Sequence, residues 1–358
     1  MKVMTPHYYK DFRCIAGACT DTCCAGWDVD VDKDSYKYYK TVKGAFGKRL
    51  KSVMVPSQDG ECTFTLKEGG RCPFLNDDNL CDLYIELGED KLCETCAEFP
   101  RFINDYGNIR EIGIAPSCKT AGELMFSYKD ELTFDTVEDN SLTPEPNDID
   151  AYTYMHLRQA RIVAFGIISD RDISIFERLM LYLDYAKRIQ KHLDAERDEL
   201  IAGVAKRFCG ADYREELLDR LKSRDEKLHG KRLIKGLRHF FDDFKGMEVI
   251  NPDWNIHVAR VRQFLDGLAD DSGLAAVMKT YHAGSEAFAH EYEQLAMYYV
   301  YRYMLDAVND YDVLLKAKNA VIGILAVDIM AAANHASVCT PDFTMRVDIA
   351  HLYSRQFE

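Results

Sequence analysis

The sequence predicts a mainly α protein, in which a small, irregular, cysteine-rich α+β N-terminal domain docks on a larger all-helical domain. Three observations support this fold class. Ten of the twelve cysteines lie in the first third of the 358 residues, an acidic stretch with prolines follows, and the remainder carries apolar residues at helical spacing. We therefore expect a cysteine-rich domain over residues 1–130, an acidic linker over 131–147 and a helical domain over 148–358.

Composition and charge restrict the possible partners. The chain is 47% hydrophobic and 29% charged, which is typical of a globular protein. A formal net charge of −14 argues against nucleic acid as a partner, because a phosphate backbone is bound by a basic surface. The same charge suits a basic or lysine-bearing target. The most apolar stretch, residues 321–333, is too short to cross a bilayer and residues 1–10 lack a signal sequence, so we expect a cytoplasmic protein with reduced thiols and no membrane partner.

Short elements are expected in the first region, because glycines interrupt any long periodicity there. Strands are predicted over residues 62–66, 101–104 and 109–114, with residues 105–108 as the hairpin turn between the last two. Helices are predicted over 33–41, 80–87, 91–98 and 117–126. Elements this small bury little apolar surface, so ligation of a metal would stabilise them.

The second region is predicted to be helical throughout. The acidic segment before it contains Pro144 and Pro146 and no lysine or arginine from residue 131 to 150, which marks an exposed boundary. Apolar residues then recur at helical spacing from Tyr152 to Phe165 and from Phe176 to Leu193. Further helices fit residues 215–228, 231–244, 256–268, 286–308, 311–333 and 343–354. Asn251-Pro252 and Thr340-Pro341 are typical helix starts.

The first four cysteines form the densest group. Cys14, Cys19, Cys23 and Cys24 fall within eleven residues, and Gly17 and Gly26 could let this backbone curl closely around a metal. Neighbouring side chains of an extended segment point to opposite faces, so the adjacent pair does not easily bind one ion. Either Cys23 and Cys24 serve different centres, or one is a ligand and the other is packed or reactive.

Five more N-terminal cysteines come in three further groups. Cys72 and Cys81 flank a turn, and Cys93 and Cys96 have the C-x-x-C spacing that can chelate one ion or cluster. Cys118 stands at a predicted helix start, where the helix dipole stabilises a thiolate. The predicted metal ligands are Cys14, Cys19, Cys23, Cys24, Cys72, Cys81, Cys93, Cys96 and Cys118.

The spacing favours an iron–sulfur cluster over zinc. Only one C-x-x-C exists, so the two-knuckle zinc-ribbon pattern is absent. The C-x-x-x-C-x-x-C pattern of radical S-adenosylmethionine chemistry is also absent, because Gly26 stands where the third cysteine would be. Many thiols at irregular spacing suit a cluster of the 4Fe–4S type, with zinc as the alternative. Cys62 fits a ligand and a buried side chain equally well, whereas Cys209 and Cys339 fit ordinary structural positions.

Several of these motifs together resemble the flagellin lysine-N-methylase family, which overlaps a broader cysteine-cluster group of zinc- or iron-chelating proteins. They are the Cys14-to-Trp27 segment, Cys72-Pro-Phe-Leu with Leu80-Cys81, Cys93-x-x-Cys96-x-x-Phe-Pro-Arg101, and Ser117-Cys118. The resemblance is dense over residues 7–125 and weaker around residues 178–184 and 293–302. It implies a protein-lysine N-methyltransferase that takes methyl groups from S-adenosylmethionine, modifies flagellin and carries a cysteine-bound iron–sulfur cluster.

The residues by themselves leave the function open. No strand, glycine-rich turn and helix of the usual nucleotide-binding kind is found, so any S-adenosylmethionine site must be built differently. The sequence assigns no catalytic base and no residue to S-adenosylmethionine. The alternatives to the enzyme are a non-catalytic metal-chelating or cluster-carrying protein with a helical partner-binding domain, and a structural zinc scaffold.

Overall fold

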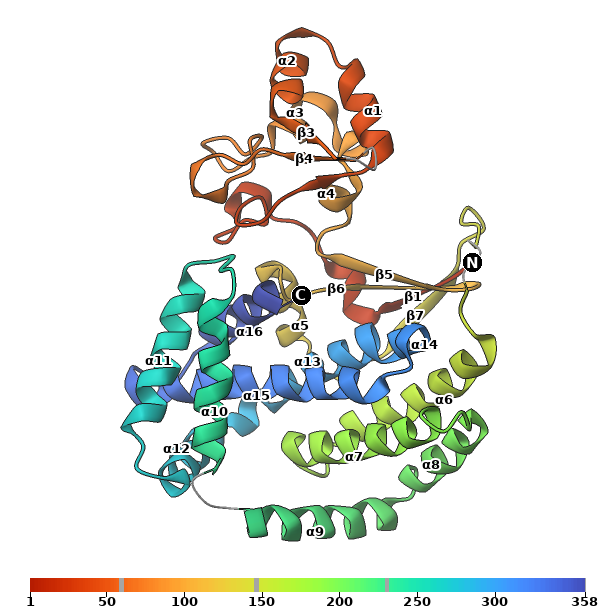
Figure 1. The fold of residues 1–358 in the computed structure, drawn as a ribbon, viewed down its shortest axis with the longest axis vertical. Coiled ribbons are helices and arrows are strands. Elements are labelled where there is room, and N and C mark those ends of the chain that lie inside the picture. The colour runs from red at the N-terminus through yellow and green to blue at the C-terminus, as the bar shows by residue number, and fades with distance from the viewer. Residues whose placement is uncertain (58–60, 145–147, 229–231, 358) are drawn as a thin grey trace.

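The computed structural model describes residues 1–57, 61–144, 148–228 and 232–357, and these residues form a mainly α protein, as predicted. Figure 1 shows three tiers. A cysteine-rich lobe, which we define as residues 14–98, stands above a four-stranded sheet, and a larger body of helices lies below the sheet. The chain enters and leaves the lobe beside this sheet, so the lobe is an excursion between the first strand and the next strand of the sheet.

The four-stranded sheet has the order β5-β6-β1-β7. The predicted hairpin is present as β5 (Arg101–Tyr106) and β6 (Ile109–Ile114), joined at Gly107, whose φ of 63° suits glycine. Strand β1 (Lys2–Pro6) runs parallel to β6 and antiparallel to β7 (Phe134–Glu138). Neither β1 nor β7 was predicted from the sequence, and β7 lies inside the predicted acidic linker. The domain boundaries themselves stay predictions.

The lobe has its own small apolar core. Its helices are α1 (Lys33–Thr41), α2 (Gly44–Val53), α3 (Asp82–Leu87) and α4 (Glu94–Glu98), and its sheet has the order β2 (Asp30–Val31), β4 (Cys62–Phe64), β3 (Met54–Pro56). Tyr39, Phe64 and Phe74 are buried in this core together with Cys62, Cys72 and Cys93. Helix α2 was not predicted, because Gly44 and Gly47 in its first turn resemble a loop.

The helical body begins after the acidic segment. Its helices are α6 (Ala151–Ile168), α7 (Ile175–Leu193), α8 (Ile201–Phe208), α9 (Ala211–Leu228), α10 (Arg232–Asp243), α11 (Asp253–Gly267), α12 (Asp271–Ala283), α13 (Ala289–Tyr303), α14 (Ala307–Asp310), α15 (Val313–Ser337) and α16 (Phe343–Phe357), with α5 (Lys119–Ser127) packed against α13 and α16.

Most of these helices follow the predicted periodicity, with local differences. Helices α8 and α12 were not predicted. The helix predicted over 286–308 is divided by a 3-10 turn between α13 and α14, and Asp342 rather than Thr340 caps α16 by accepting a hydrogen bond from the backbone N–H of Met345 at 2.9 Å. Lys231 and residues 145–147, at the predicted start of a helix and end of the linker, lie outside the described residues.

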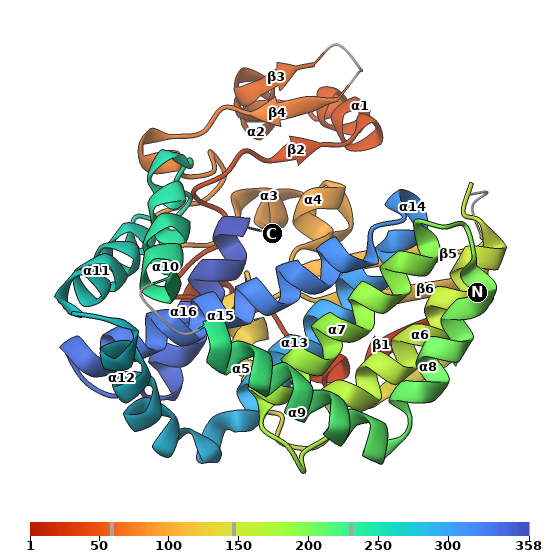
Figure 2. The ribbon, with the colours of Figure 1, turned by 60° about the horizontal axis from the view of Figure 1, so that its bottom comes forward.

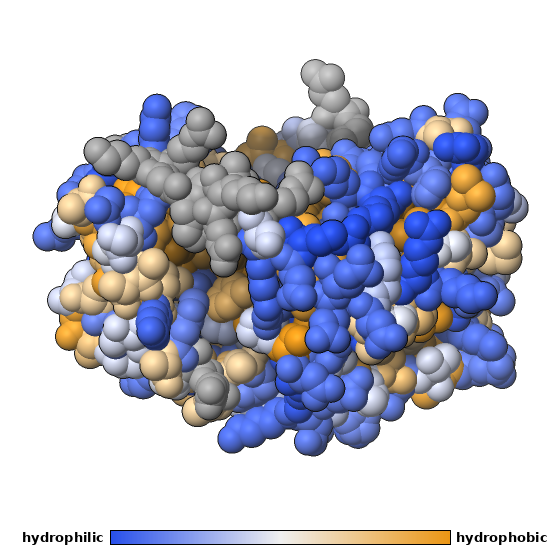
Figure 3. Space-filling view, turned by 90° about the horizontal axis from the view of Figure 1, so that it is seen from below, coloured by the Kyte–Doolittle hydropathy of each residue, from blue (hydrophilic) through white to orange (hydrophobic). Residues whose placement is uncertain are grey.

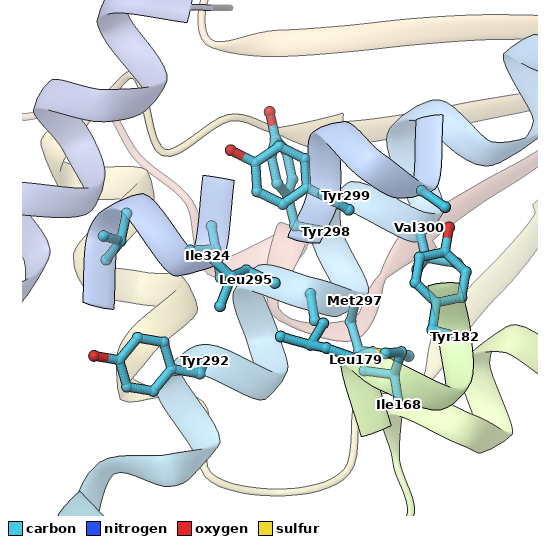
Figure 4. Close-up of a cluster of buried hydrophobic side chains, with 14 of the residues drawn as sticks. Ile168, Leu179, Tyr182, Tyr292, Leu295, Met297, Tyr298, Tyr299, Val300 and Ile324 are labelled. Carbon is cyan, nitrogen blue, oxygen red and sulfur yellow. The ribbon is translucent and has the colours of Figure 1, made fainter. Parts of the chain in front are cut away.

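Helices α13 and α15 form the centre of the body, as Figures 1 and 2 both show. Every residue from Glu291 to Tyr301 on α13 is buried, which is typical of a helix surrounded by others. Figure 4 shows several of these side chains, among them Leu295, Met297 and Val300, between neighbouring helices. The hydroxyl of Tyr301 donates to the carbonyl of Met4 at 2.7 Å, so the same helix also supports the sheet.

One buried ion pair connects the sheet to the helical body, and another lies within that body. Arg161 on α6 donates to the carboxylate of Glu111 on β6 at 2.7 Å, with both side chains almost fully buried. Arg178 on α7 donates to Glu293 on α13, also at 2.7 Å.

Among the described residues, no helix combines the length and the apolarity that crossing a bilayer requires. Figure 3 shows that the face seen from below is largely hydrophilic, with apolar residues scattered over it.

Candidate metal centre

Backbone hydrogen bonds bring three of the predicted ligands side by side. The N–H of Cys72 donates to the carbonyl of Cys24 at 2.8 Å, and Leu75 forms an isolated antiparallel bridge with Cys81. The Cys81 thiol then caps α3 by accepting the N–H of Tyr84 at 3.5 Å. Segments that lie far apart in the sequence therefore meet because their main chains pair, not because of any one local motif.

Three glycines near these thiols, Gly17, Gly26 and Gly70, lie where other backbone approaches closely. The N–H of Gly26 donates to the carbonyl of Gly70 at 2.9 Å, and φ is 88° and 71° at these two residues. A Cβ at Gly26 would collide with the carbonyl oxygen of Ile250, and one at Gly17 would lie 2.9 Å from the carbonyl oxygen of Asp78. Both glycines accommodate other backbone, and the expectation that they let the chain approach a metal stays a prediction.

Five cysteines line one cavity of about 60 Å³ in the lobe. They are Cys23, Cys24, Cys72, Cys81 and Cys96. The rest of the lining is apolar and aromatic apart from Thr95, and it includes Trp27 and Phe99, whose rings lie 5.7 Å apart. Thiols from separate segments therefore converge on an otherwise apolar hollow, where a thiolate would be poorly solvated unless a cation bound it.

The pKa values of the adjacent residues Cys23 and Cys24 are shifted in opposite directions. The thiol of Cys23 donates a hydrogen bond to Cys24, and this bond lowers the pKa of Cys24 to about 7 against the opposing effect of burial. Arg355 and Arg71 lower it further. The same hydrogen bond raises the pKa of Cys23. This direction of the pKa shift favours the thiolate form of Cys24, which is the form that binds metals.

The other thiols around the cavity are shifted by burial and by each other. Burial raises the pKa of Cys72 to about 11 and also raises that of Cys81. A hydrogen bond between Cys93 and Cys96 lowers the pKa of Cys93 and raises that of Cys96. The charges of Cys24 and Cys72 both raise the pKa of Cys96, which shows that these thiols interact electrostatically. Without a bound cation these thiols are not readily deprotonated together, because the negative charge of one thiolate raises the pKa of the others.

A second set of thiols lies toward the helical body. Burial raises the pKa of Cys19 and of Cys118, and the charge of Cys14 raises both further. Cys14 and Cys118 likewise act on Cys23. Cys118 precedes α5, and the N–H groups of that helix start offset part of its shift. Of this set only Cys23 lines the cavity described above.

Residues that the sequence did not single out hold this second set in place. Asp21 accepts hydrogen bonds from Nε2 of His351 at 2.8 Å, from Asn251 at 2.6 Å and from Arg355 at 3.1 Å. Nδ1 of His351 lies 3.0 Å from the carbonyl oxygen of Pro116, two residues before Cys118. Burial by itself would raise the pKa of Asp21, but His351 and Arg355 hold it below its ordinary value. We call the hydrogen bonds that join Asp21, His351 and Arg355 the clamp. No sequence signal marks the clamp, because Asp21 and His351 are 330 residues apart.

The remaining cysteines lie elsewhere. Cys62 is buried in the apolar core of the lobe, and Cys209 and Cys339 are exposed. In the part of the chain that the structure describes, no three His, Cys, Asp or Glu side chains are arranged to hold a single metal ion.

Comparison with known proteins finds relatives of one kind. A family model described as the FliB lysine N-methylase C-terminal domain matches residues 161–358. The flagellar biosynthetic protein FliU of Salmonella muenchen is 30% identical over 121 residues, which cover 32% of this chain and 72% of FliU. No solved structure matches.

Two proteins named lysine-N-methylase are also similar. They come from Salmonella choleraesuis and Salmonella typhimurium, and each is 29% identical over 121 residues. This chain spans 30% of the length of each of these two relatives. The match to the family model covers the helical region, where the sequence motifs had indicated only the weaker part of the resemblance.

Proposed function

We propose, because the chain belongs to the FliB lysine N-methylase family, that it is a protein-lysine N-methyltransferase that uses S-adenosylmethionine and acts on flagellin. The proposal includes an iron–sulfur cluster bound by Cys24, Cys72, Cys81 and Cys96, and it places the activity in the cytoplasm, where thiols stay reduced. The observation that carries it is the convergence of these thiols on one cavity in a member of this family.

The donor set suits the proposed cluster. Four cysteines are the usual ligands of a 4Fe–4S centre, and the lowered pKa of Cys24 favours its deprotonated, metal-binding form. Four thiolates can also bind zinc, so the metal must be measured. When bound, a cluster supplies iron atoms that act as Lewis acids toward carboxylate or amine groups. The surrounding side chains exclude water from the thiols, because the lining is mainly apolar.

Methyl transfer would make two further demands on this chain. The lysine amine must be neutral, so that its lone pair forms the new N–C bond while the S–C bond of the sulfonium breaks. The sulfonium cation must also be held, and an aromatic face such as that of Trp27 or Phe99 beside the cavity suits a cation. The net charge of −14 favours approach of a lysine-bearing protein.

A direct assay tests the enzyme hypothesis. The chain is purified without oxygen, loaded with iron and sulfide, and incubated with S-adenosylmethionine and purified flagellin, and modified lysines are mapped by mass spectrometry. We expect methylated lysines with the parent chain and with the control Cys209→Ser, whose thiol is exposed. We expect at least a tenfold loss with Cys72→Ser. No methylation by a fully loaded parent chain would overturn the enzyme hypothesis, and full activity of a cluster-free Cys72→Ser chain would overturn the role of the cluster.

A second candidate is a cluster-carrying or metal-chelating protein that binds a partner without catalysis. The observation in its favour is the size of the cavity, since about 60 Å³ is too small for S-adenosylmethionine. The described sheets also lack the parallel, doubly wound arrangement of nucleotide-binding methyltransferases. Calorimetric titration of the loaded chain with S-adenosylmethionine separates the two candidates, because only the enzyme requires saturable binding.

A further inference from the structure

Strand β7 forms one edge of the four-stranded sheet and lies beside β1 (Figure 1). Among the described strands it pairs with β1 alone, through all five of its residues. Four of these five residues are exposed. An exposed strand edge offers backbone N–H and C=O groups to a strand from another chain.

The hydrogen bonds to β1 identify which backbone groups lie on the open edge. The N–H of Asp139 donates to the carbonyl of Met1 at 2.9 Å, and the amino group of Met1 donates to the carbonyl of Asp139 at 2.7 Å. Hydrogen-bonded pairs alternate along an antiparallel ladder, so Val137 and Asp135 also direct their backbone groups toward β1. The groups on the open edge are then those of the alternate residues, namely Phe134, Thr136 and Glu138.

The two faces of β7 have different surroundings. The ring of Phe134 lies 4.6 Å from that of Tyr301, so its face rests on the helical body. Val137 points to the opposite face and is 60% exposed. Asp135 and Asp139 share that face, because they stand two residues before and after Val137. A residue of an added strand directly opposite Val137 would be at a non-hydrogen-bonded position, where side chains approach most closely.

The charge of this face indicates what would bind there. A lysine opposite Val137 would cover the valine with its methylene groups and place its ammonium between the carboxylates of Asp135 and Asp139. His7 lies 3.0 Å from Asp135 and Lys2 is opposite Glu138, so neighbours on the β1 side offset only part of the acidic charge. A second copy of this chain, with a formal net charge of −14, would instead bring like charges together.

We propose that the open edge of β7 binds an extended, lysine-bearing segment of a partner protein as an added β-strand, with a lysine of that segment opposite Val137. This inference rests on the proposed function, because it describes how a lysine-bearing substrate is captured. Strand β5, which begins two residues after Phe99 of the cavity lining, forms the other edge of the sheet. Neighbouring strands lie about 4.8 Å apart, so β7 is roughly 14 Å from β5. The edge is therefore a docking surface separate from the cavity.

Thr136→Pro tests the added strand directly. The N–H of Thr136 points to the open edge, so a proline removes an outward donor and leaves the hydrogen bonds to β1 in place. Thr136→Ala keeps this N–H and is the matched control. Val137→Lys tests the position of the bound lysine by placing a like charge opposite it, and Val55→Lys is its control, since Val55 is 51% exposed on the edge strand β3. Circular dichroism checks that each variant is folded.

Binding is measured by isothermal titration calorimetry without S-adenosylmethionine, so the result does not depend on methyl transfer. The probes are a synthetic peptide of alternating threonine and lysine, the same peptide with glutamate in place of lysine, and purified flagellin. We expect the parent chain, Thr136→Ala and Val55→Lys to bind the lysine peptide and flagellin equally well. Thr136→Pro and Val137→Lys should each bind about fivefold more weakly or worse. The glutamate peptide should not bind, and high salt should weaken binding of the lysine peptide.

Equal affinities of Thr136→Pro and Thr136→Ala would overturn the added strand, and equal affinities of Val137→Lys and Val55→Lys would overturn the lysine position. If sedimentation shows a dimer of the parent that Thr136→Pro dissociates, the occupant is a second copy and the proposal is wrong. If Thr136→Pro does not fold, hydrogen exchange on the parent decides. Bound peptide should protect the amides of Thr136 and Glu138, and unchanged exchange at both would overturn the proposal.

The methylation assay separates failure of this inference from failure of the proposed function. A docking surface away from the cavity should alter the KM for flagellin and leave kcat nearly unchanged in Thr136→Pro. A parent chain that binds flagellin through β7 but never methylates it would refute the methyltransferase and retain the docking edge. A parent chain and a Thr136→Pro variant that methylate flagellin with the same KM would refute the docking edge alone.

Discussion

Replacing His351 by alanine should loosen the attachment of the cysteine-rich lobe to the helical body. The substitution removes a hydrogen bond to the Asp21 carboxylate at 2.8 Å and one to the Pro116 carbonyl at 3.0 Å. A buried hydrogen bond to a charged group contributes about 1.5–3 kcal/mol and a neutral one about 1 kcal/mol. Asp21 keeps Asn251 and Arg355 as partners, so we expect a loss near the lower end, about 3 kcal/mol in the free energy of unfolding.

Urea unfolding followed by circular dichroism measures this loss, and hydrogen exchange shows where it acts. Exchange should rise in residues 19–26 and at the start of α5, while the centre of α13 stays protected because its packing is untouched. His351→Gln keeps a donor and should recover part of the loss. His239→Ala is the control, since that side chain is 81% exposed. If His351→Ala unfolds within about 0.5 kcal/mol of the parent, the clamp does not hold the lobe.

Two further predictions concern the backbone at Gly26 and the titration of His257. Gly26→Ala should destabilise the chain more than Gly44→Ala, because φ is positive at both glycines but only at Gly26 would a Cβ meet other backbone. Gly44→Ala should lower the free energy of unfolding by roughly 1–2 kcal/mol, from conformational strain alone. Equal urea midpoints for the two variants would contradict a close approach at Gly26. Burial lowers the pKa of His257 in the folded chain. As the pH falls, its imidazole is therefore protonated in the unfolded chain before it is protonated in the folded chain. The contribution of His257 to stability is therefore complete above its ordinary pKa of about 6.5 and is lost as the pH falls toward the lowered folded value. His257→Gln should flatten this part of the stability profile, and an unchanged slope would count against the assignment.

The sequence could predict elements whose signal is local. The strand at Ile109–Ile114 has the predicted bounds, and the periodicity of α7 follows its buried face. Strands β1 and β7 were missed because each gains its structure from a partner more than a hundred residues away, with Lys2 pairing both Ile109 and Glu138. No local pattern distinguishes such a strand from an extended loop. Helix α2 was missed for the opposite reason, since Gly44 and Gly47 oppose a helix that tertiary packing nevertheless stabilises.

The site shows the same division between local and distant signals. Crowding of cysteines in the sequence was enough to predict a thiol-rich site, and the adjacency of Cys23 and Cys24 was enough to raise the possibility of separate roles. The influence of Cys14 and Cys19 on the pKa of Cys118 was not predictable, because it depends on where the start of α5 lies in the tertiary structure. Asp21 and His351 gave no signal at all, since a lone carboxylate and a lone histidine are common in any chain.

The position of the clamp links the two halves of the chain physically. The apolar core of the lobe consists of short elements and includes three cysteines among its buried side chains, so it has little hydrophobic surface with which to stabilise itself. The loop that carries Cys19, Cys23 and Cys24 is held instead by hydrogen bonds from α16, which lies within the region matched by the family model. The helical region therefore does more than support the lobe, because its last helix also fixes the position of the loop that carries these three thiols. A substitution on α16 should thus change metal binding without touching a cysteine.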